Sequence, residues 1–349
     1  MSHQLDSTND VVSYADSRTD AWHRLGTPVG HSMTAREALT VAHLVGWNVR
    51  KMALSIPRQP VLTELGVTTP APIPVPDMFA TVRDNPIVPG RIDYLGVVGT
   101  KYEPVQNEAS CTLLDAITDQ SGAHYETAGA LRDGRDTFIT MKLPKTMTLH
   151  GRNGQTDRTD FYLAALNSHD GSAAFRVIVT PVRIVCANTQ KAALAAARSS
   201  YAIRHTTGAR AAITQARHAL GLTWRYLEAF EAEAAALYAQ DMHVDEMREF
   251  ATTLVKADDP AASRTARTRR QQQANHIVKL FVSSPTVANV AGTRWAAYNA
   301  VSEYLDHHQP VRGARNHGDA VTARAIRAVT AGSAADTLKL QAFRLLQTT

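Results

Sequence analysis

The chain has 349 residues, a net charge of +5 at pH 7, 44% hydrophobic residues and 20% charged residues. This composition is typical of a globular protein with room for two domains, and the absence of an apolar run of about 18 residues argues against a membrane-spanning helix. The only two cysteines, Cys111 and Cys186, give neither a disulfide framework nor a zinc-ligand spacing. We therefore expect a protein of the reducing cytoplasm that has no signal peptide and holds no metal or cofactor.

The positive charge is concentrated near the end of the chain. Residues 260–349 contain 12 basic and 4 acidic residues, whereas residues 1–209 are almost neutral and residues 210–259 are acidic. A basic segment of this kind is typical of a protein with a polyanionic partner, most often nucleic acid. A solvated helical surface, or one that contacts an acidic protein, would give the same pattern.

The N-terminal part combines a polar start with one helix and one strand. Residues 1–20 are polar, and we expect them to be disordered. A helix is predicted to begin after Thr34, because Thr34 and Glu37 match a capping box and small apolar residues then recur at helical spacing. Residues 47–56 alternate as a strand. Residues 57–76 carry six prolines and are predicted to form an extended loop.

Short strands and hairpins dominate the next segment. Two Asp-Gly pairs, Asp133-Gly134 and Asp170-Gly171, are strong signals for hairpin turns between alternating strands. A helix is predicted to begin at Asn107 and to end near residue 120. Further strands are predicted over 78–83, 94–102, 125–131, 137–143 and, in two pieces, 160–186. The expected fold of residues 21–190 is therefore an α+β domain with a mostly antiparallel sheet.

From about residue 189 onward the sequence is Ala-rich and follows helical spacing. The pattern predicts four or five helices over 191–349, with an Ala-rich helix that begins at Asn188-Thr189. The predicted breaks between helices are Asp259-Pro260, Ser284-Pro285 and residues 307–318. We expect an all-α region whose C-terminal part is basic.

The hairpin at Asp170-Gly171 contains two weak catalytic candidates, His169 and Asp170. A His-Asp pair can bind a metal, but metal-binding pairs usually sit on a helix with further ligands at fixed offsets. Here the pair precedes Gly171 in a turn, where Asp is favoured for turn geometry alone. We therefore expect a turn and no metal site.

Cys186 is a third weak candidate, because it precedes the predicted helix start and a helix N-terminus favours a thiolate. His205 or His169 would then act as its base. A free cysteine at the end of an apolar strand is more often a small core residue. An enzyme that uses Asn167, His169, Asp170, Cys186 and Asn188 is kept as an alternative.

Arginines form the candidate nucleic-acid interface. Arg176 and Arg183 flank the strand that follows Gly171, and their spacing of seven places them on opposite faces of a regular strand, so one of them could instead form a buried ion pair. A denser cluster opens a predicted helix, and it would neutralise several phosphates. Its members, with a second group further on, are Arg264, Arg267, Arg269, Arg270, Lys279, Arg312 and Arg315.

Trp295, Tyr298 and Tyr304 follow the basic cluster and could stack on bases. Trp295 and Tyr298 are spaced like one face of a helix, which favours the core instead. The chain contains none of the motifs GxxxxGK[ST], GxGxxG after a strand, HExxH or GxSxG. A P-loop NTPase, a dinucleotide-dependent dehydrogenase, a zinc protease and an α/β-hydrolase are therefore not expected.

Several sequence blocks occur together, in order, between residues 21 and 308. They include AWHRLGTPV, LGVVGTKYEPVQNEA, TAGALRDGRDTFITMKL, NSHDGSAAFRVIVTPVRIVCANTQKAAL and GTRWAAYNAVSEYLDH. These blocks resemble the uncharacterised phage/plasmid-like protein family catalogued as domain of unknown function 932. The resemblance implies an origin in phages, prophages or plasmids, and it implies no settled activity.

We expect a non-enzymatic DNA-binding protein that acts in single-strand annealing, recombination or replication of a phage or plasmid. The expected partner is single-stranded DNA, contacted mainly through phosphates, and the protein is expected to form a homo-oligomer. The inferred order of N-terminal elements is loosely similar to that of single-strand annealing proteins, although no sequence motif is shared. The main alternative is an interaction protein that docks on a host factor through its basic helices.

Overall fold

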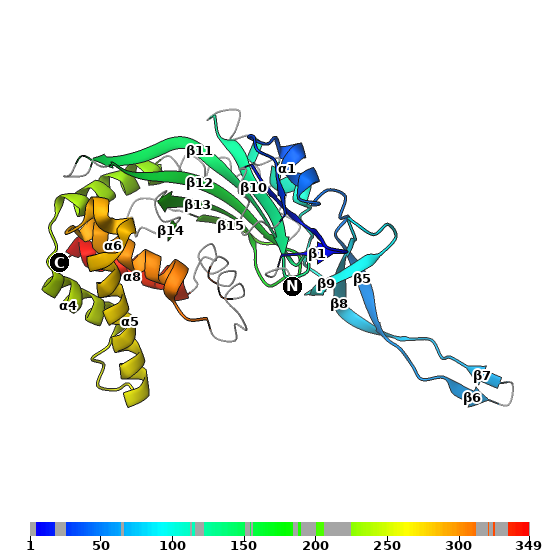
Figure 1. Cartoon of the computed structure of the whole chain (residues 1–349). Helices are drawn as coiled ribbons and strands as arrows, with labels where there is room; N and C mark the ends of the chain where they lie inside the picture. Colours follow the sequence, from blue (N-terminus) through cyan, green and yellow to red (C-terminus); the bar gives the residue numbers. More distant parts are fainter. Residues whose placement is uncertain are drawn as a thin grey trace. The chain divides into compact units, whose positions relative to one another are not determined.

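The computed structural model of the chain describes residues 5–17, 26–63, 66–111, 114–115, 122–150, 154, 156–183, 188–189, 200–205, 225–311, 320, 324 and 334–348 (Figure 1). Two compact units are present, and each is assembled from segments that are distant in sequence. Unit 1 comprises 1–141, 164–178 and 201–218, and unit 2 comprises 142–163, 179–200 and 219–349. Within the described part of the chain, no helix is long and apolar enough to cross a membrane.

The largest sheet has the strand order β14-β13-β12-β11-β10-β3-β4, with β15 paired to β13. Its central strands are β10 (His124–Leu131), β11 (Asp136–His150), β12 (Thr156–Ser168) and β13 (Phe175–Arg183). Buried and half-buried residues alternate along β11, as expected for a strand with one face in the core. The predicted turn at Asp133-Gly134 joins β10 to β11, where Arg132, Asp133 and Gly134 all have positive φ. The predicted α+β class with mostly antiparallel sheets is confirmed.

The N-terminal segment is ordered, so the prediction of disorder is wrong for residues 5–17. These residues form β1 (Ser7–Thr8), β2 (Val11–Val12) and β3 (Tyr14–Asp16), and β3 pairs with β10, with Ala15 opposite Ala128. A fourth short strand, β4 (Thr27–Pro28), continues the same sheet. Leu5 and Tyr14 pack in the core of this unit, together with Leu131 and Phe138. The polar composition of the N-terminal segment did not predict these contacts with residues that are distant in sequence.

Unit 1 also contains a helix and a second sheet. Helix α1 (Ala35–Val41) begins as predicted, with the Thr34 hydroxyl accepting a hydrogen bond from the Glu37 amide. The second sheet has the order β5-β8-β9 and is formed by β5 (Arg50–Ile56), β8 (Ile73–Asp84) and β9 (Ile92–Gly99). Its strands agree with the alternating patterns in the sequence.

Residues 57–76 are not simply a loop, and that prediction is wrong for much of the segment. Strands β6 (Val61–Thr63) and β7 (Gly66–Thr68) pair as a hairpin, and β8 already begins at Ile73. Proline is tolerated here because each two-stranded ribbon leaves one backbone edge of each strand unpaired. The strand pairing therefore survives a proline content that would break a central strand.

Unit 2 is mainly helical. Residues 225–239 are helical, followed by α4 (Val244–Val255), α5 (Arg264–Ser283), η2 (Pro285–Val290), α6 (Arg294–Glu303), η3 (Tyr304–His308) and α8 (Ala334–Thr348). The breaks at Asp259-Pro260 and Ser284-Pro285 lie between helices, as predicted. Every residue from Trp295 to Glu303 is buried, so α6 is the central helix of this unit.

The start of the predicted helical region is wrong. Residues Asn188–Thr189 form strand β14 and residues Ser200–Ile203 form strand β15, and both strands pair with β13. Sheet pairing with β13 therefore overrides the local helical pattern at these positions. The remainder of the predicted Ala-rich helix lies outside the described residues.

Candidate functional site

The exposed face of α5 carries the basic cluster. The hydroxyl of Ser263 accepts a hydrogen bond from the Ala266 amide and caps the helix, and Ala274, Ile277, Leu280 and Phe281 form its buried face. At about 100° per residue, the opposite face presents exposed side chains along its length. These side chains include Arg264, Thr268, Gln271, Gln272, Asn275 and Lys279, and Arg267 and Arg269 are exposed at its two opposite margins.

No acidic side chain offsets this charge on α5. The sequence contains no Asp or Glu between Asp259 and Glu303. The first two turns of α5 therefore hold several arginines at the positive end of the helix macrodipole, where cations are unfavourable and anions are stabilised. The local arrangement is costly for an isolated helix and suits an anionic ligand.

Arg270 differs from its neighbours. Its guanidinium lies 3.1 Å from a carboxylate oxygen of Asp259 and donates a hydrogen bond of 3.0 Å to the carbonyl oxygen of Lys256. Lys256 is the C-cap of α4. The Arg270 side chain therefore links the C-terminal end of α4 to the first half of α5. The cations left for a ligand on this helix are Arg264, Arg267, Arg269 and Lys279.

The other predicted arginines do not join this face within the described residues. Arg176 is half-buried in the part of β13 that belongs to unit 1. Arg183 ends the same strand in unit 2, and its side chain lies outside the described part of the structure, as do Arg312 and Arg315. Among the predicted cations whose side chains the structure describes, those of α5 lie together on one element.

The aromatic residues of α6 belong to the core. Trp295 and Tyr298 are completely buried, and Tyr304 is 5% exposed. The Trp295 indole nitrogen donates a hydrogen bond of 2.9 Å to Asp157, and its ring packs against Phe230 and Tyr298. Trp295 and Tyr298 are buried by packing, as their spacing predicted, Tyr304 is buried as well, and the three rings offer no stacking platform for bases.

The segment around His169 is a buried polar network. His169 is completely buried, its Nε2 atom lies 3.0 Å from Oδ1 of Asn107, and its ring packs on Trp47. His205 is also buried and stacks on the Tyr102 ring, with centroids 4.9 Å apart. Burial, together with the positive charges of His205 and Arg83, lowers the pKa of His169 to about 3. At neutral pH, His169 is therefore uncharged.

Asp170 stabilises the hairpin turn through hydrogen bonds. Its carboxylate accepts hydrogen bonds from the Ser168 hydroxyl and the Ser172 amide, and it lies 3.1 Å from the Arg132 guanidinium. Gly171 has a φ of +79°, a conformation that glycine adopts without strain. Among the described residues, no group of three or more His, Cys, Asp or Glu side chains is arranged to hold a metal.

Only one of the two cysteines, Cys111, lies among the described residues. Cys186 lies outside the described residues, so the proposed nucleophile is not placed. Cys111 is buried, and burial together with the nearby charge of Asp115 raises its pKa to about 12. A thiol with this pKa carries almost no thiolate at pH 7 and is a poor nucleophile.

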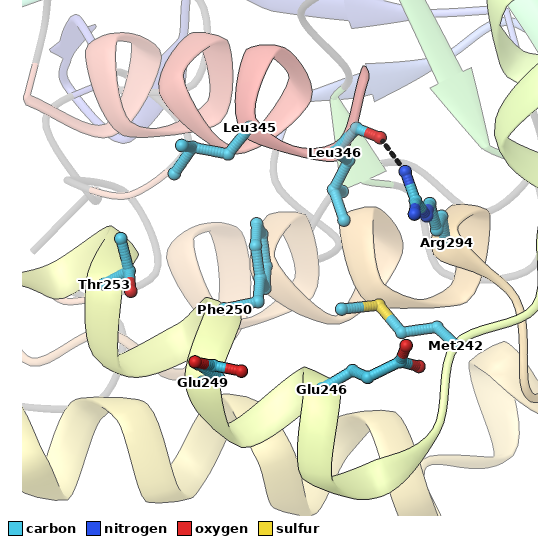
Figure 2. A pocket seen from close by; sticks show the side chains of 8 residues that line it. All are labelled: Met242, Glu246, Glu249, Phe250, Thr253, Arg294, Leu345 and Leu346. Atoms are coloured by element: carbon cyan, nitrogen blue, oxygen red, sulfur yellow. Dashed lines mark hydrogen bonds between the residues drawn. The ribbon is translucent and has the colours of Figure 1, made fainter. Parts of the chain in front are cut away.

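The structure also contains a pocket that the sequence did not predict. A pocket of about 310 Å³ lies between α4 and α8, and the guanidinium of Arg294 at its side donates a hydrogen bond of 2.9 Å to the carbonyl oxygen of Leu346 (Figure 2). Met242, Phe250 and Leu346 make part of its lining apolar, and the two carboxylates come from Glu246 and Glu249. The lining suits a small apolar group that carries a positive charge, and it contains no nucleophile paired with a base.

Comparison with known proteins identifies the family. The domain family described as Domain of unknown function (DUF932) matches residues 94–329. The chain belongs to the DUF932 family. No curated protein and no solved structure matches the chain. The DUF932 match includes His169, Asn107 and all of α5, whereas strands β1 to β8, with Trp47 and Arg83, precede it.

Proposed function

We propose that this DUF932 protein binds nucleic acid through its phosphates, with single-stranded DNA of a phage or plasmid as the expected form. The observation that carries the proposal is the exposed surface of α5, a packed helix that bears no acidic residue: Arg264 and Lys279 lie on the face opposite the core, and Arg267 and Arg269 lie at the margins of that face. Such a face neutralises phosphates, and binding then releases condensed counterions.

The neutral side chains between the cations support the same proposal. Gln271, Gln272 and Asn275 are exposed between Arg264 and Lys279, and amide groups are common ligands of phosphates and base edges. A helix face selected only for solubility more often mixes charges of both signs. The face of α5 has one sign only.

The same face lacks exposed aromatic side chains along α5, whose only aromatic residue apart from His276 is the buried Phe281. Stacking on bases therefore contributes nothing from this helix, and binding relies on phosphates. We expect weak base preference and steep salt dependence. Such binding fits an accessory role in annealing, recombination or replication and needs no catalytic group.

The test is fluorescence anisotropy of the full chain with labelled single-stranded and double-stranded DNA across a salt series. The key variant combines Arg264→Ala, Arg267→Ala and Arg269→Ala. The matched control combines Arg36→Ala, Arg58→Ala and Arg158→Ala, which removes three exposed arginines elsewhere and gives the same net charge.

We expect the α5 variant to lose at least tenfold in affinity and to reduce the slope of log K against log salt by about two, because each phosphate contact contributes roughly 0.7 to 0.9 to this slope. The control should bind within about twofold of the wild type. Absence of binding at about 50 mM salt would refute the proposal. In that case, the basic face would dock on an acidic protein, and nuclease-insensitive capture of one host partner would identify it.

A further inference from the structure

Exposed apolar side chains gather in one part of unit 1. Ten of the thirteen exposed large hydrophobic side chains among the described residues lie between Met52 and Val97. They form two surfaces, which we call the arm (residues 56–73) and the sheet face (one side of β5, β8 and β9). Concentrated apolar exposure of this kind usually marks a contact surface.

The arm is a ribbon whose described residues are almost all exposed. Leu62 is 79% exposed and Val67 is 73% exposed, and both lie near the tip of the β6–β7 hairpin. Figure 1 shows this hairpin at the far end of the ribbon that β5 and β8 begin. About six residues separate Ile56 from Leu62, so the arm reaches roughly 20 Å beyond the end of β5.

Prolines limit the ways in which the arm can bind. Four prolines lie within the arm, at positions 57, 60, 70 and 72, and each lacks the amide donor that an added strand would need. The base of the arm therefore resists pairing through its backbone edges, whereas residues 61–69 at the tip contain no proline. At the tip, Leu62 and Val67 offer exposed apolar side chains for contacts.

The sheet face is defined by the strand register. Met52 lies opposite Ala80, Ala80 lies opposite Val97, and these residues point to the same side of the sheet. Met52, Met78, Tyr94 and Val97 are each at least 40% exposed. No residue of β5 is buried, although its sequence RKMALSI is that of a half-buried strand. Several apolar side chains on this side of the sheet are therefore exposed, although Ala80 between them is buried.

We propose that the arm of one copy packs on the sheet face of a second copy of this chain. The arm of the same copy does not reach this face, because β5 and β8 stay paired as far as Ile56 and Ile73 and so carry the arm away from it. Both surfaces are present in every copy, so two reciprocal contacts cover the arm and the sheet face of each copy.

The charge of the arm supports a second copy of this chain as its binding partner. Residues 56–73 contain one Arg and one Glu and are neutral overall, so neither nucleic acid nor a strongly charged protein is matched to them. Two neutral apolar surfaces are complementary to each other, and reciprocal exchange of arms would close a two-fold dimer. The inference concerns unit 1 and does not depend on nucleic-acid binding by α5.

The test is the mass of the full chain in solution, measured by light scattering after size-exclusion chromatography. The wild type should be a dimer or larger. The arm variant combines Leu62→Asp and Val67→Asp, and the face variant combines Met52→Lys and Val97→Lys. Both change exposed residues, so both should keep the wild-type circular dichroism and unfold cooperatively. Each variant alone should be a monomer.

Mixing the two variants provides a second readout. A mixture retains one wild-type arm and one wild-type sheet face, and it adds aspartates opposite lysines, so a heterodimer should form. The matched control, Val244→Asp with Val282→Asp, charges the exposed valines of unit 2 and should keep the wild-type mass. A monomeric wild type, or an arm variant with wild-type mass, would overturn the proposal. DNA binding by the monomeric variants, measured in parallel, separates this outcome from failure of the proposed function.

Discussion

The Nε2 atom of His169 lies 3.0 Å from the Oδ1 atom of Asn107, and both side chains are buried. The amide nitrogen of Asn107 donates to the carbonyl oxygen of Leu44, so Oδ1 is an acceptor, and the hydroxyl of Thr137 also donates to it. His169 therefore donates from Nε2. Its Nδ1 atom has no hydrogen-bond partner among the described residues. A proton added at Nδ1 would be a buried donor without an acceptor, so the fold favours the neutral ring.

This geometry predicts that the protein loses stability in mild acid. The pKa of His169 is lowered to about 3 in the folded state, whereas an unperturbed histidine titrates near pH 6.5. Between these values the unfolded chain binds a proton that the folded chain does not. The free energy of unfolding should therefore fall by up to about 1.4 kcal/mol per pH unit below pH 6.5. His169 alone should contribute about 2 kcal/mol to the stability that urea unfolding shows to be lost between pH 7 and pH 5.

The control for this prediction is His169→Gln, because the glutamine amide can still donate to Asn107 but does not titrate. Burial also lowers the pKa of His205, so part of the acid sensitivity should persist in the variant. The variant should lose less stability between pH 7 and pH 5 than the wild type does. Equal losses in the two proteins would contradict the role assigned to His169.

Arg83 is predicted to be essential for the stability of unit 1. Its guanidinium is buried, lies 2.9 Å from Asp6 and 3.2 Å from Asp93, and packs over the Trp47 ring at 4.0 Å. Replacing Arg83 with Met leaves the buried Asp6 carboxylate without this cation, which should cost about 3 to 5 kcal/mol. Thermal and urea unfolding measure the loss. Arg91→Met, which removes an exposed partner of Asp93, should cost less than about 1 kcal/mol.

Trp295 is predicted to affect stability and not DNA binding. Its indole donates to the completely buried Asp157, and it packs on Phe230 and Tyr298. Trp295→Phe should lower the free energy of unfolding by about 2 to 3 kcal/mol, because it reduces packing and removes a donor to a buried carboxylate. The variant should bind DNA as the wild type does wherever it is folded. A selective loss of DNA affinity at full stability would show that this ring contacts bases.

Cys111 is predicted to be inert in the native protein. Its thiol is buried and its pKa is raised to about 12, so very little thiolate forms at pH 8. Peptide mass spectrometry after treatment with iodoacetamide should find Cys111 unmodified in the native protein and modified in guanidinium chloride. Rapid native labelling of Cys111 would contradict its burial. The same measurement reports the accessibility of Cys186.

Local sequence patterns were sufficient for several elements. The cap at Thr34, the turn at Asp133-Gly134 and the break at Ser284-Pro285 all appear where the sequence predicts them. Each depends on residues within about four positions of one another, so chain geometry alone determines the outcome. The sequence also predicted that the basic cluster opens a helix, because helical spacing is a local property of the chain.

The failures come from contacts between distant residues. Strands β3 and β14 are short and have weak local patterns, and each forms because a longer strand, β10 or β13, offers an unpaired edge. Local propensity is easily overridden when a neighbouring strand satisfies the backbone hydrogen bonds. The polar N-terminal segment was mispredicted because its few apolar residues are buried by partners more than 100 positions away, such as Leu131.

The sequence by itself determined that this chain is an α+β protein with a basic helix that begins near Arg264, because helical spacing and charge are local properties. Only the tertiary structure decided that Arg270 is tied to Asp259 while its neighbours stay exposed. It also decided that His169 is buried beside Asn107, and that the apolar residues of the arm are left without cover. The physical reason is that burial and pairing depend on which surfaces meet in space. The sequence specifies the side chains, but it does not show which side chains become neighbours in the fold.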